Sequence, residues 1–438
     1  MSERNPVSKL LRGPLGLVLL IALAARCASV FLRPDLMGVD TDGYLDIARH
    51  LARGLGFSAG EPPYLTAFRP PLYPLFVAPF LFAPNGLTLL AIAQIVLGTC
   101  TVWLTYQLAV RVNLSRPASL VTAAFVACDP ILIHVTATAM TETLCTFLIA
   151  LWGLQFVRTD TEDRRCHLLS GVLLGLLCLC RPTFLPFVGL VFVAGAIRFF
   201  LPGGGADQFA TTRKFGSRLV IQVVCAALVV CPWLIRNGVW LGKWTPATTH
   251  GGYTLLLGNN SEFYREVIGG PWNRAWSGEQ LGRWQADLER QIGEVKPPII
   301  EERDRDAWFY RTAMESIRAE PRMFLQACLY RLFRFWDVLP QHPVRDQLPP
   351  SMQGLFAGYF SLEWLLAVVG LIAALRSRQG VWWGLIALIV SVCGVHLFYW
   401  TDLRMRAPLM PLLAVLAGLG WEVLFHSFSR PKVAANSV

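Results

Sequence analysis

The stretch Leu15–Leu32, LGLVLLIALAARCASVFL, carries a single charged residue, Arg26, in an otherwise almost entirely apolar run. About 20 such residues can cross the hydrocarbon core of a bilayer as an α-helix. The run is longer than the apolar core of about 7–15 residues in a cleaved signal peptide, so we expect it to remain as an anchor. This first segment predicts a helical membrane protein.

The composition of the whole chain agrees with this prediction. Of the 438 residues, 54% are hydrophobic and 16% are charged, whereas soluble domains average about 25% charged residues. The sequence predicts an all-α polytopic membrane protein with ten transmembrane helices. These are residues 13–32, 88–110, 117–133, 140–157, 168–181, 183–201, 218–236, 355–375, 381–399 and 408–426. The shorter apolar stretch Leu72–Phe82 predicts an interfacial or re-entrant helix.

The net charge of +10 comes from basic residues that lie singly between apolar segments. This spacing does not build the basic face of a nucleic-acid-binding domain, so nucleic acid is excluded as a partner. With the N-terminus in the cytoplasm, the inner loops and the C-terminal tail hold 16 Lys and Arg against five Asp and Glu, whereas residues 237–325 hold 11 against 12. Because basic residues concentrate in cytoplasmic loops, both termini are predicted to be cytoplasmic.

This orientation puts two sizeable segments, residues 33–87 and 237–354, on the outer side. We predict three parts: a transmembrane module with the first outer loop (residues 1–236), a small mainly helical extracytoplasmic loop domain (237–354), and C-terminal transmembrane helices with a cytoplasmic tail (355–438). Within the loop domain, apolar residues recur at helical spacing over Asp306–Trp336. This pattern predicts one amphipathic helix on the outer leaflet.

Two carboxylates occur within three residues of the stretch Gly38–Tyr44, GVDTDGY, directly after the first membrane segment. At the lipid–water boundary, a partly desolvated Asp can act as a general base. For Asp42 we favour a structural role, capping the helix that is predicted to begin at Tyr44. Asp40 could act as such a base.

Further charged residues lie at the outer ends of predicted helices, where they need a partner or a function. Glu142 lies in the short turn between the third and fourth segments, where it could approach the first outer loop or interact with a helix N-terminus. Lys and Arg are disfavoured in short outer loops, so arginines there point to an anionic lipid phosphate, which guanidinium binds bidentately. The alternative is contact with phospholipid headgroups. These arginines are Arg69, Arg181, Arg236, Arg404 and Arg406.

In their order along the chain, these motifs resemble the GT-C superfamily of membrane glycosyltransferases. The nearest resemblance is to the bacterial aminoarabinose lipid A transferases and the protein O-mannosyltransferases of glycosyltransferase family 39. The matching features are Asp40 and Tyr44 with Leu45–Ala48, Gly54–Gly56, Arg69–Pro74, Thr141–Glu142, Arg181–Pro182, Pro232–Asn237, Gly258–Asn259 and Leu403–Pro408.

The resemblance implies a sugar donor linked to undecaprenyl or dolichyl phosphate, chemistry on the outer face, and a lipid, glycan or protein acceptor. Asp40 matches the family's first-loop Asp and would be the general base of an inverting transfer, with Glu142 orienting the acceptor or supporting the first loop. Arg69 matches the basic residue on the donor phosphate. The predicted donor site also contains Tyr44, Tyr73, Arg181, Arg236, Arg404 and Arg406. Many relatives carry Asp-Glu where this chain has Asp40-Thr41, so Asp42 could supply a second carboxylate.

Other possibilities stay open at this point. Clustered carboxylates could bind a divalent cation such as Mg²⁺, although two loop aspartates are a weak indication, and no other cofactor is predicted. A transporter or lipid flippase would also be polytopic and basic, but it usually has charges inside its membrane helices and paired repeats. A silent membrane scaffold would not require Asp40, Arg69 and Glu142 at one level. The resemblance implies the inner membrane of a bacterium.

Overall fold

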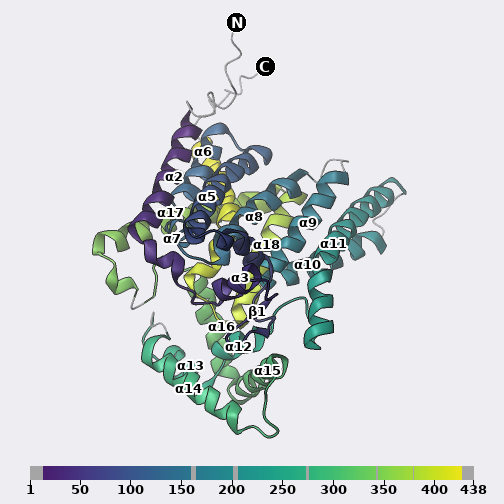
Figure 1. Cartoon of the computed structure of the whole chain (residues 1–438). Helices are drawn as coiled ribbons and strands as arrows, with labels where there is room; N and C mark the ends of the chain where they lie inside the picture. Colours follow the sequence, from purple (N-terminus) through teal and green to yellow (C-terminus); the bar gives the residue numbers. More distant parts are fainter. Residues whose placement is uncertain are drawn as a thin grey trace, which may run out of the picture.

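The computed structural model describes residues 13–158, 164–200, 206–272, 276–341, 344–377 and 379–426. Nearly all regular structure in these ranges is helical (Figure 1). Within them the one sheet has two short antiparallel strands, β1 (Ser58–Ala59) and β2 (Tyr64–Leu65). The predicted class, an all-α polytopic membrane protein, is confirmed.

Six helices of the described part are long and apolar enough to cross a membrane. They are α2 (Pro14–Leu32), α5 (Gly86–Arg111), α11 (Ala206–Leu241, its apolar part from Gly216), α17 (Pro350–Ser377), α18 (Gly380–Phe398), and the 3₁₀ segment η7 (Leu403–Leu409) continued by α19 (Met410–His426). The other predicted spans correspond to shorter helices. These are α6 (Arg116–Cys128), α7 (Pro130–Val135), α8 (Thr141–Val157), α9 (Arg164–Cys180), and η4 (Pro182–Phe184) with α10 (Leu185–Phe200).

The predicted continuous helix over residues 117–133 is wrong, because the chain breaks between α6 and α7 at Asp129. Asp129 has extended backbone angles, and its carboxylate accepts hydrogen bonds from the backbone N–H groups of Ile131 and Leu132. It is therefore the N-cap of α7, and Pro130 occupies the first helical position, where its missing N–H costs nothing.

The outer segments form short helices of their own. The first contains η1 (Pro34–Gly38), α3 (Tyr44–Ala52), α4 (Leu72–Val77) and η2 (Ala78–Phe82). The second contains α12 (Gly251–Leu257), α13 (Ser261–Phe263), a π-helical turn η5 (Tyr264–Ile268), α14 (Gly278–Glu294), α15 (Glu302–Ala319), α16 (Pro321–Phe335) and η6 (Arg345–Gln347). Helices α13, α14 and α15 lie at the end of the molecule opposite α6 (Figure 1). They share an apolar cluster that includes Phe263, Trp284 and Phe309.

The single amphipathic helix predicted over Asp306–Trp336 is also wrong, because α15 ends at Ala319 and α16 begins at Pro321. Proline lacks the N–H that would continue the helix, and it disfavours helical angles at the residue before it. Glu320 accordingly leaves the helical conformation, with φ −128° and ψ 61°.

Two of the three C-terminal membrane helices, α17 and α19, approach each other closely enough to require glycine. A Cβ atom at Gly370 of α17 would lie 1.8 Å from the carbonyl oxygen of Leu416, and one at Gly420 of α19 would lie 1.9 Å from that of Leu366. Small residues allow membrane helices to pack backbone against backbone. This packing anchors α19, and with it the preceding segment η7, which carries Arg404 and Arg406.

Candidate active site

The first outer loop reaches the site through a sharp turn at Gly43, whose positive φ of 74° suits glycine. Helix α3 begins at the next residue, and the carboxylate of Asp40 caps it. Its Oδ1 accepts the N–H of Leu45 at 3.0 Å, and its Oδ2 accepts the N–H of Asp46 at 2.7 Å. Both oxygens therefore satisfy N–H groups that the first turn of a helix leaves unpaired.

The helix cap predicted at Asp42 is therefore wrong. Asp40, not Asp42, caps α3, while the carboxylate of Asp42 turns towards two arginines. Its Oδ1 lies 3.1 Å from Nη2 of Arg69, and its Oδ2 lies 3.6 Å from Nη1 of Arg404. The Nε of Arg69 also donates to the backbone carbonyl of Asp42 at 2.5 Å.

Glu142 joins this group from the first turn of α8. Its Oε1 lies 3.6 Å from both Nη1 of Arg181 and Nε of Arg404. Its Oε2 is buried without a hydrogen-bond partner in the described structure, as is Nη1 of Arg181. Unpaired buried polar atoms are costly, so these two atoms are suited to contact a bound polar ligand.

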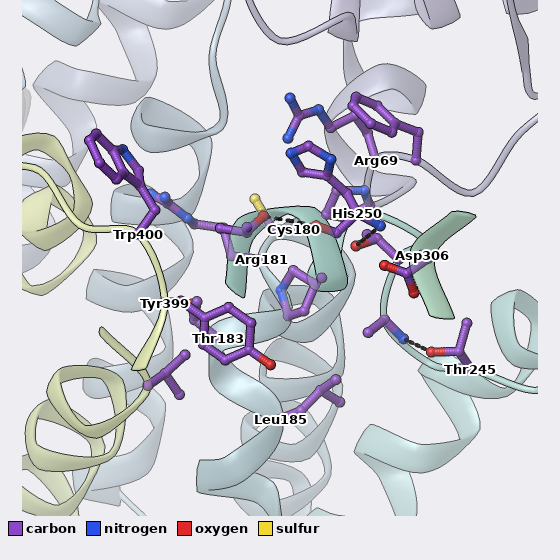
Figure 2. Close-up of a pocket in the computed structure, with 18 of the residues that line it drawn as sticks. Arg69, Cys180, Arg181, Thr183, Leu185, Thr245, His250, Asp306, Tyr399 and Trp400 are labelled. Atoms are coloured by element: carbon purple, nitrogen blue, oxygen red, sulfur yellow. Dashed lines mark hydrogen bonds between the residues drawn. The ribbon is translucent and has the colours of Figure 1, made fainter. Parts of the chain in front are cut away.

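Two cavities meet at this cluster. A carboxylate cavity of about 600 Å³ is lined by Asp42, Glu142, Arg404 and outer-domain side chains such as Tyr253 and Glu289. An amphipathic cavity of about 460 Å³ runs towards the membrane helices, where Leu185 of α10 and Val395 of α18 line it. Tyr44, Phe68, Arg69, Arg181, His250, Thr254, Trp400 and Met405 line both. In Figure 2, Arg69, His250 and Arg181 lie towards one end of the amphipathic cavity, and Leu185 lies at the other.

Two groups of the outer domain line the amphipathic cavity, and the sequence had no motif that pointed to them. Lys243 pairs with the buried carboxylate of Asp306, whose other oxygen accepts the N–H of Gly252 at 2.7 Å. The ring of His250 lies 4.2 Å from that of Phe68. Lys243 and His250 lie in the loop after α11, where the hydropathy has no regular pattern. Only the folded chain shows that they line the cavity.

Four predicted donor-site residues lie in the cluster: Arg69, Arg181, Arg404 and Tyr44. Burial raises the pKa of Tyr44 to about 12, with Arg69 acting in the opposite direction. The Tyr44 side chain is therefore a neutral hydroxyl at pH 7. The guanidinium of Arg69 lies over its ring, 5.3 Å from the centroid.

The other three predicted donor-site residues line neither of these two cavities. Tyr73 is fully buried with its hydroxyl 3.4 Å from Oε1 of Gln94. Arg236 donates to the carbonyl oxygens of Thr66 at 2.6 Å and Phe57 at 2.9 Å. The hydroxyl group of Tyr73 and the guanidinium of Arg236 are therefore already engaged in hydrogen bonds within the protein.

Arg406 is likewise buried away from the cavities. Its Nη1 donates to the carbonyl oxygens of Phe335 at 2.8 Å and Asp337 at 2.6 Å, and its guanidinium lies 4.4 Å from the ring centroid of Phe360. Arg406 therefore fixes η7 in place, while Arg404, two residues earlier, faces the cavity.

Replacing Arg406 with Ala is expected to lower the free energy of unfolding by about 1–3 kcal/mol, because the carbonyl oxygens of Phe335 and Asp337 lose their donor. Thermal unfolding of the detergent-purified protein, followed by tryptophan fluorescence, measures this. The control is Arg265→Ala at an exposed arginine. An unchanged midpoint combined with weaker binding of a polyprenyl phosphate would instead return Arg406 to the donor site.

Burial and the charge of Arg69 lower the pKa of His250 well below its ordinary value of 6.5. Below pH 6.5 the unfolded chain therefore protonates His250, whereas the folded protein does not. The free energy of unfolding consequently falls as the pH drops below 6.5. Between pH 7 and about pH 5, the wild-type protein should lose up to about 2 kcal/mol more unfolding free energy than His250→Gln. Denaturant titration at each pH measures the difference, and parallel pH profiles would refute it.

Residues 69–235 match the family model described as dolichyl-phosphate-mannose-protein mannosyltransferase. No curated protein sequence matches the chain.

Among solved structures, the oligosaccharyltransferase of Archaeoglobus fulgidus with a tethered acceptor peptide superposes with a TM-score of 0.54 at 13% identity, covering 98% of this chain and 52% of that one. The same organism's AglB in complex with an inhibitory peptide and a dolichol-phosphate gives 0.54 at 14% identity, covering 99% and 53%. The chain has the GT-C fold. It spans about half the length of the oligosaccharyltransferase chains.

ArnT from Cupriavidus metallidurans bound to undecaprenyl phosphate gives a TM-score of 0.38 at 14% identity, covering 95% of this chain and 78% of that one. The superfamily resemblance expected from the short motifs is confirmed. The six long apolar helices and the fold support an integral membrane protein.

Proposed function

We propose that this GT-C protein transfers a sugar from a polyprenyl-phosphate donor to a hydroxyl group of a lipid, glycan or protein acceptor. The observation that carries the proposal is the junction of the two cavities. There, Arg69 and Arg181 stand between an amphipathic cavity, which reaches the membrane helices, and a cavity lined by the carboxylates of Asp42 and Glu142. A lipid-linked anionic donor has the apolar tail, the phosphate and the sugar in this same order.

The donor phosphate would bind Arg69 and Arg181, and its prenyl chain would extend past Leu185 and Val395. Guanidinium groups offer planar, paired N–H donors that match phosphate oxygens. Nη1 of Arg181 has no hydrogen-bond partner in the described structure, so it is available to the phosphate. The solved AglB complex with a dolichol-phosphate supports the same class of ligand for this fold.

The proposed reaction is a single inverting displacement. The acceptor oxygen forms a bond to the anomeric carbon, the bond from that carbon to the phosphate oxygen breaks, and the electron pair leaves with the polyprenyl phosphate. The acceptor proton passes to Asp42, which replaces Asp40 as the proposed base because both oxygens of Asp40 cap α3. The arginines stabilise the charge that develops on the leaving phosphate. A retaining route would instead need a nucleophilic carboxylate about 5 Å from the acid/base.

Glu142 would orient a substrate hydroxyl through its unpaired Oε2. A carboxylate that accepts a hydrogen bond from a sugar or acceptor hydroxyl fixes the geometry of attack without taking the proton itself. The excess of Lys and Arg in the predicted inner loops supports cytoplasmic termini and an outer-face site. We assign the protein to the inner membrane of a bacterium, as its resemblance to the bacterial transferases implies.

To test this proposal, the purified protein is reconstituted in liposomes with a cell-envelope extract as acceptor. A panel of labelled polyprenyl-phosphate sugars is added, and the release of polyprenyl phosphate is measured. Release by the wild-type protein, and its loss in Asp42→Asn, is the expected result. Movement of the intact donor across the liposome membrane without release would support the flippase alternative. Absence of both would refute the transferase for the donors tested.

A further inference from the structure

Two carboxylates of the carboxylate cavity, those of Asp42 and Glu142, already face a cation that belongs to the chain. Arg404 lies between them, with Nη1 3.6 Å from Oδ2 of Asp42 and Nε 3.6 Å from Oε1 of Glu142. The two carboxylates come from different elements, the loop before α3 and the first turn of α8. One guanidinium thus bridges two segments about 100 residues apart in the sequence.

A divalent cation does not fit this arrangement. Mg²⁺ requires oxygen ligands at about 2.1 Å in near-octahedral geometry, and Ca²⁺ requires six to eight oxygens at about 2.3–2.6 Å. In the described ranges, no group of three or more His, Cys, Asp or Glu side chains could hold a metal ion. The Arg404 guanidinium occupies the position between Asp42 and Glu142 that such an ion would need.

The surrounding structure holds Arg404 at this position. Its backbone N–H donates to Oδ1 of Asp402 at 2.8 Å, and Oδ2 of Asp402 lies 3.6 Å from its Nε. Two residues further on, Arg406 ties η7 to the end of α16 through the carbonyl oxygens of Phe335 and Asp337. The cation is therefore placed before any substrate binds, which is the condition for electrostatic stabilisation without reorganisation.

We propose that Arg404 takes the place of a divalent cation, and that the site works without one. The statement about catalysis rests on the proposed function. The statement that Arg404 occupies a cation position is independent of that function. Three guanidinium groups, those of Arg69, Arg181 and Arg404, lie against three carboxylates, those of Asp42, Glu142 and Asp402. These six groups balance one another's charges without a metal ion.

The first experiment titrates the purified protein in detergent with Mn²⁺ and measures bound ion by electron paramagnetic resonance. Removing the guanidinium in Arg404→Ala should create a Mn²⁺ site that binds at least about tenfold more tightly than any in the wild-type protein. Adding Asp42→Asn to that variant should abolish the new site. The matched control is Arg265→Ala, which removes an exposed arginine that also pairs with two carboxylates and should create no such site.

If Arg404→Ala does not fold, Arg404→Gln keeps most of the side chain and serves the same titration. The proposal is overturned if the wild-type protein binds Mn²⁺ as tightly as the Arg404 variants and Asp42→Asn removes that binding. It is also overturned if folded Arg404 variants gain no site.

The second experiment measures release of polyprenyl phosphate. The wild-type rate should be unchanged by a chelator, whereas Arg404→Gln should lose activity by about 10²-fold or more and recover part of it with Mn²⁺. Loss of wild-type activity on chelation, restored by Mn²⁺, would overturn the inference and leave the transferase proposal standing. Failure of the wild-type protein with every donor would sink the transferase proposal, while the Mn²⁺ titration still decides the role of Arg404.

Discussion

Asp42→Asn is expected to lower the rate of sugar transfer by about 10²–10⁴-fold, the usual contribution of a positioned general base. Asn retains the size of the side chain and can still accept a hydrogen bond from Arg69, but it cannot take the acceptor proton. The measurement is the single-turnover release of polyprenyl phosphate at saturating donor, which separates the chemical step from donor binding.

The matched control is Asp40→Asn, two residues away. Asn is a good helix cap, so this variant should keep a transfer rate within about tenfold of wild type and lose at most about 1 kcal/mol of stability. If Asp40→Asn inactivates the enzyme while Asp42→Asn does not, the assignment suggested by the family resemblance is correct and the one drawn from the cavity is wrong.

Arg69→Ala is expected to have the second large effect, a loss of about 10²–10³-fold in kcat, because charge on the departing phosphate loses a preorganised donor. Arg69 is 15% exposed at its side chain, lies beside Asp42 and lines both cavities. Arg69→Lys should restore only part of the rate, since an ammonium cannot bind phosphate bidentately. Steady-state kinetics with varied donor concentration measures both variants.

Arg236→Ala is the matched control, because Arg236 was also predicted to bind the phosphate. It donates to the carbonyl oxygens of Thr66 and Phe57 and lines neither cavity. Its loss should reduce thermal stability and leave kcat of the folded enzyme within about tenfold of wild type, since its hydrogen bonds do not change during the reaction. Equal losses of kcat in Arg69→Ala and Arg236→Ala would argue that both arginines act through the position of the first outer loop.

Much of the architecture could be predicted because it depends on local composition. Long apolar runs such as Leu15–Leu32 form helices wherever they occur, since the backbone must satisfy its own hydrogen bonds in lipid. The outer turns that carry Arg69, Glu142 and Arg404 could be placed for the same reason. The errors, such as the breaks at Asp129 and Pro321, arose where a cap or a proline interrupts a hydropathy pattern that continues across it.

The sequence by itself determined the helical membrane class, because transfer of side chains between water and lipid depends on each residue and its near neighbours. Only the tertiary structure showed that Asp42 and Arg404 line a cavity, whereas Asp40 and Arg406 bind backbone groups. The two aspartates are two residues apart, as are the two arginines, and the members of each pair are chemically alike, so hydropathy cannot separate them. Their roles are set by groups brought from distant elements, backbone N–H or carbonyl groups for one member and opposite charges at the cavity for the other.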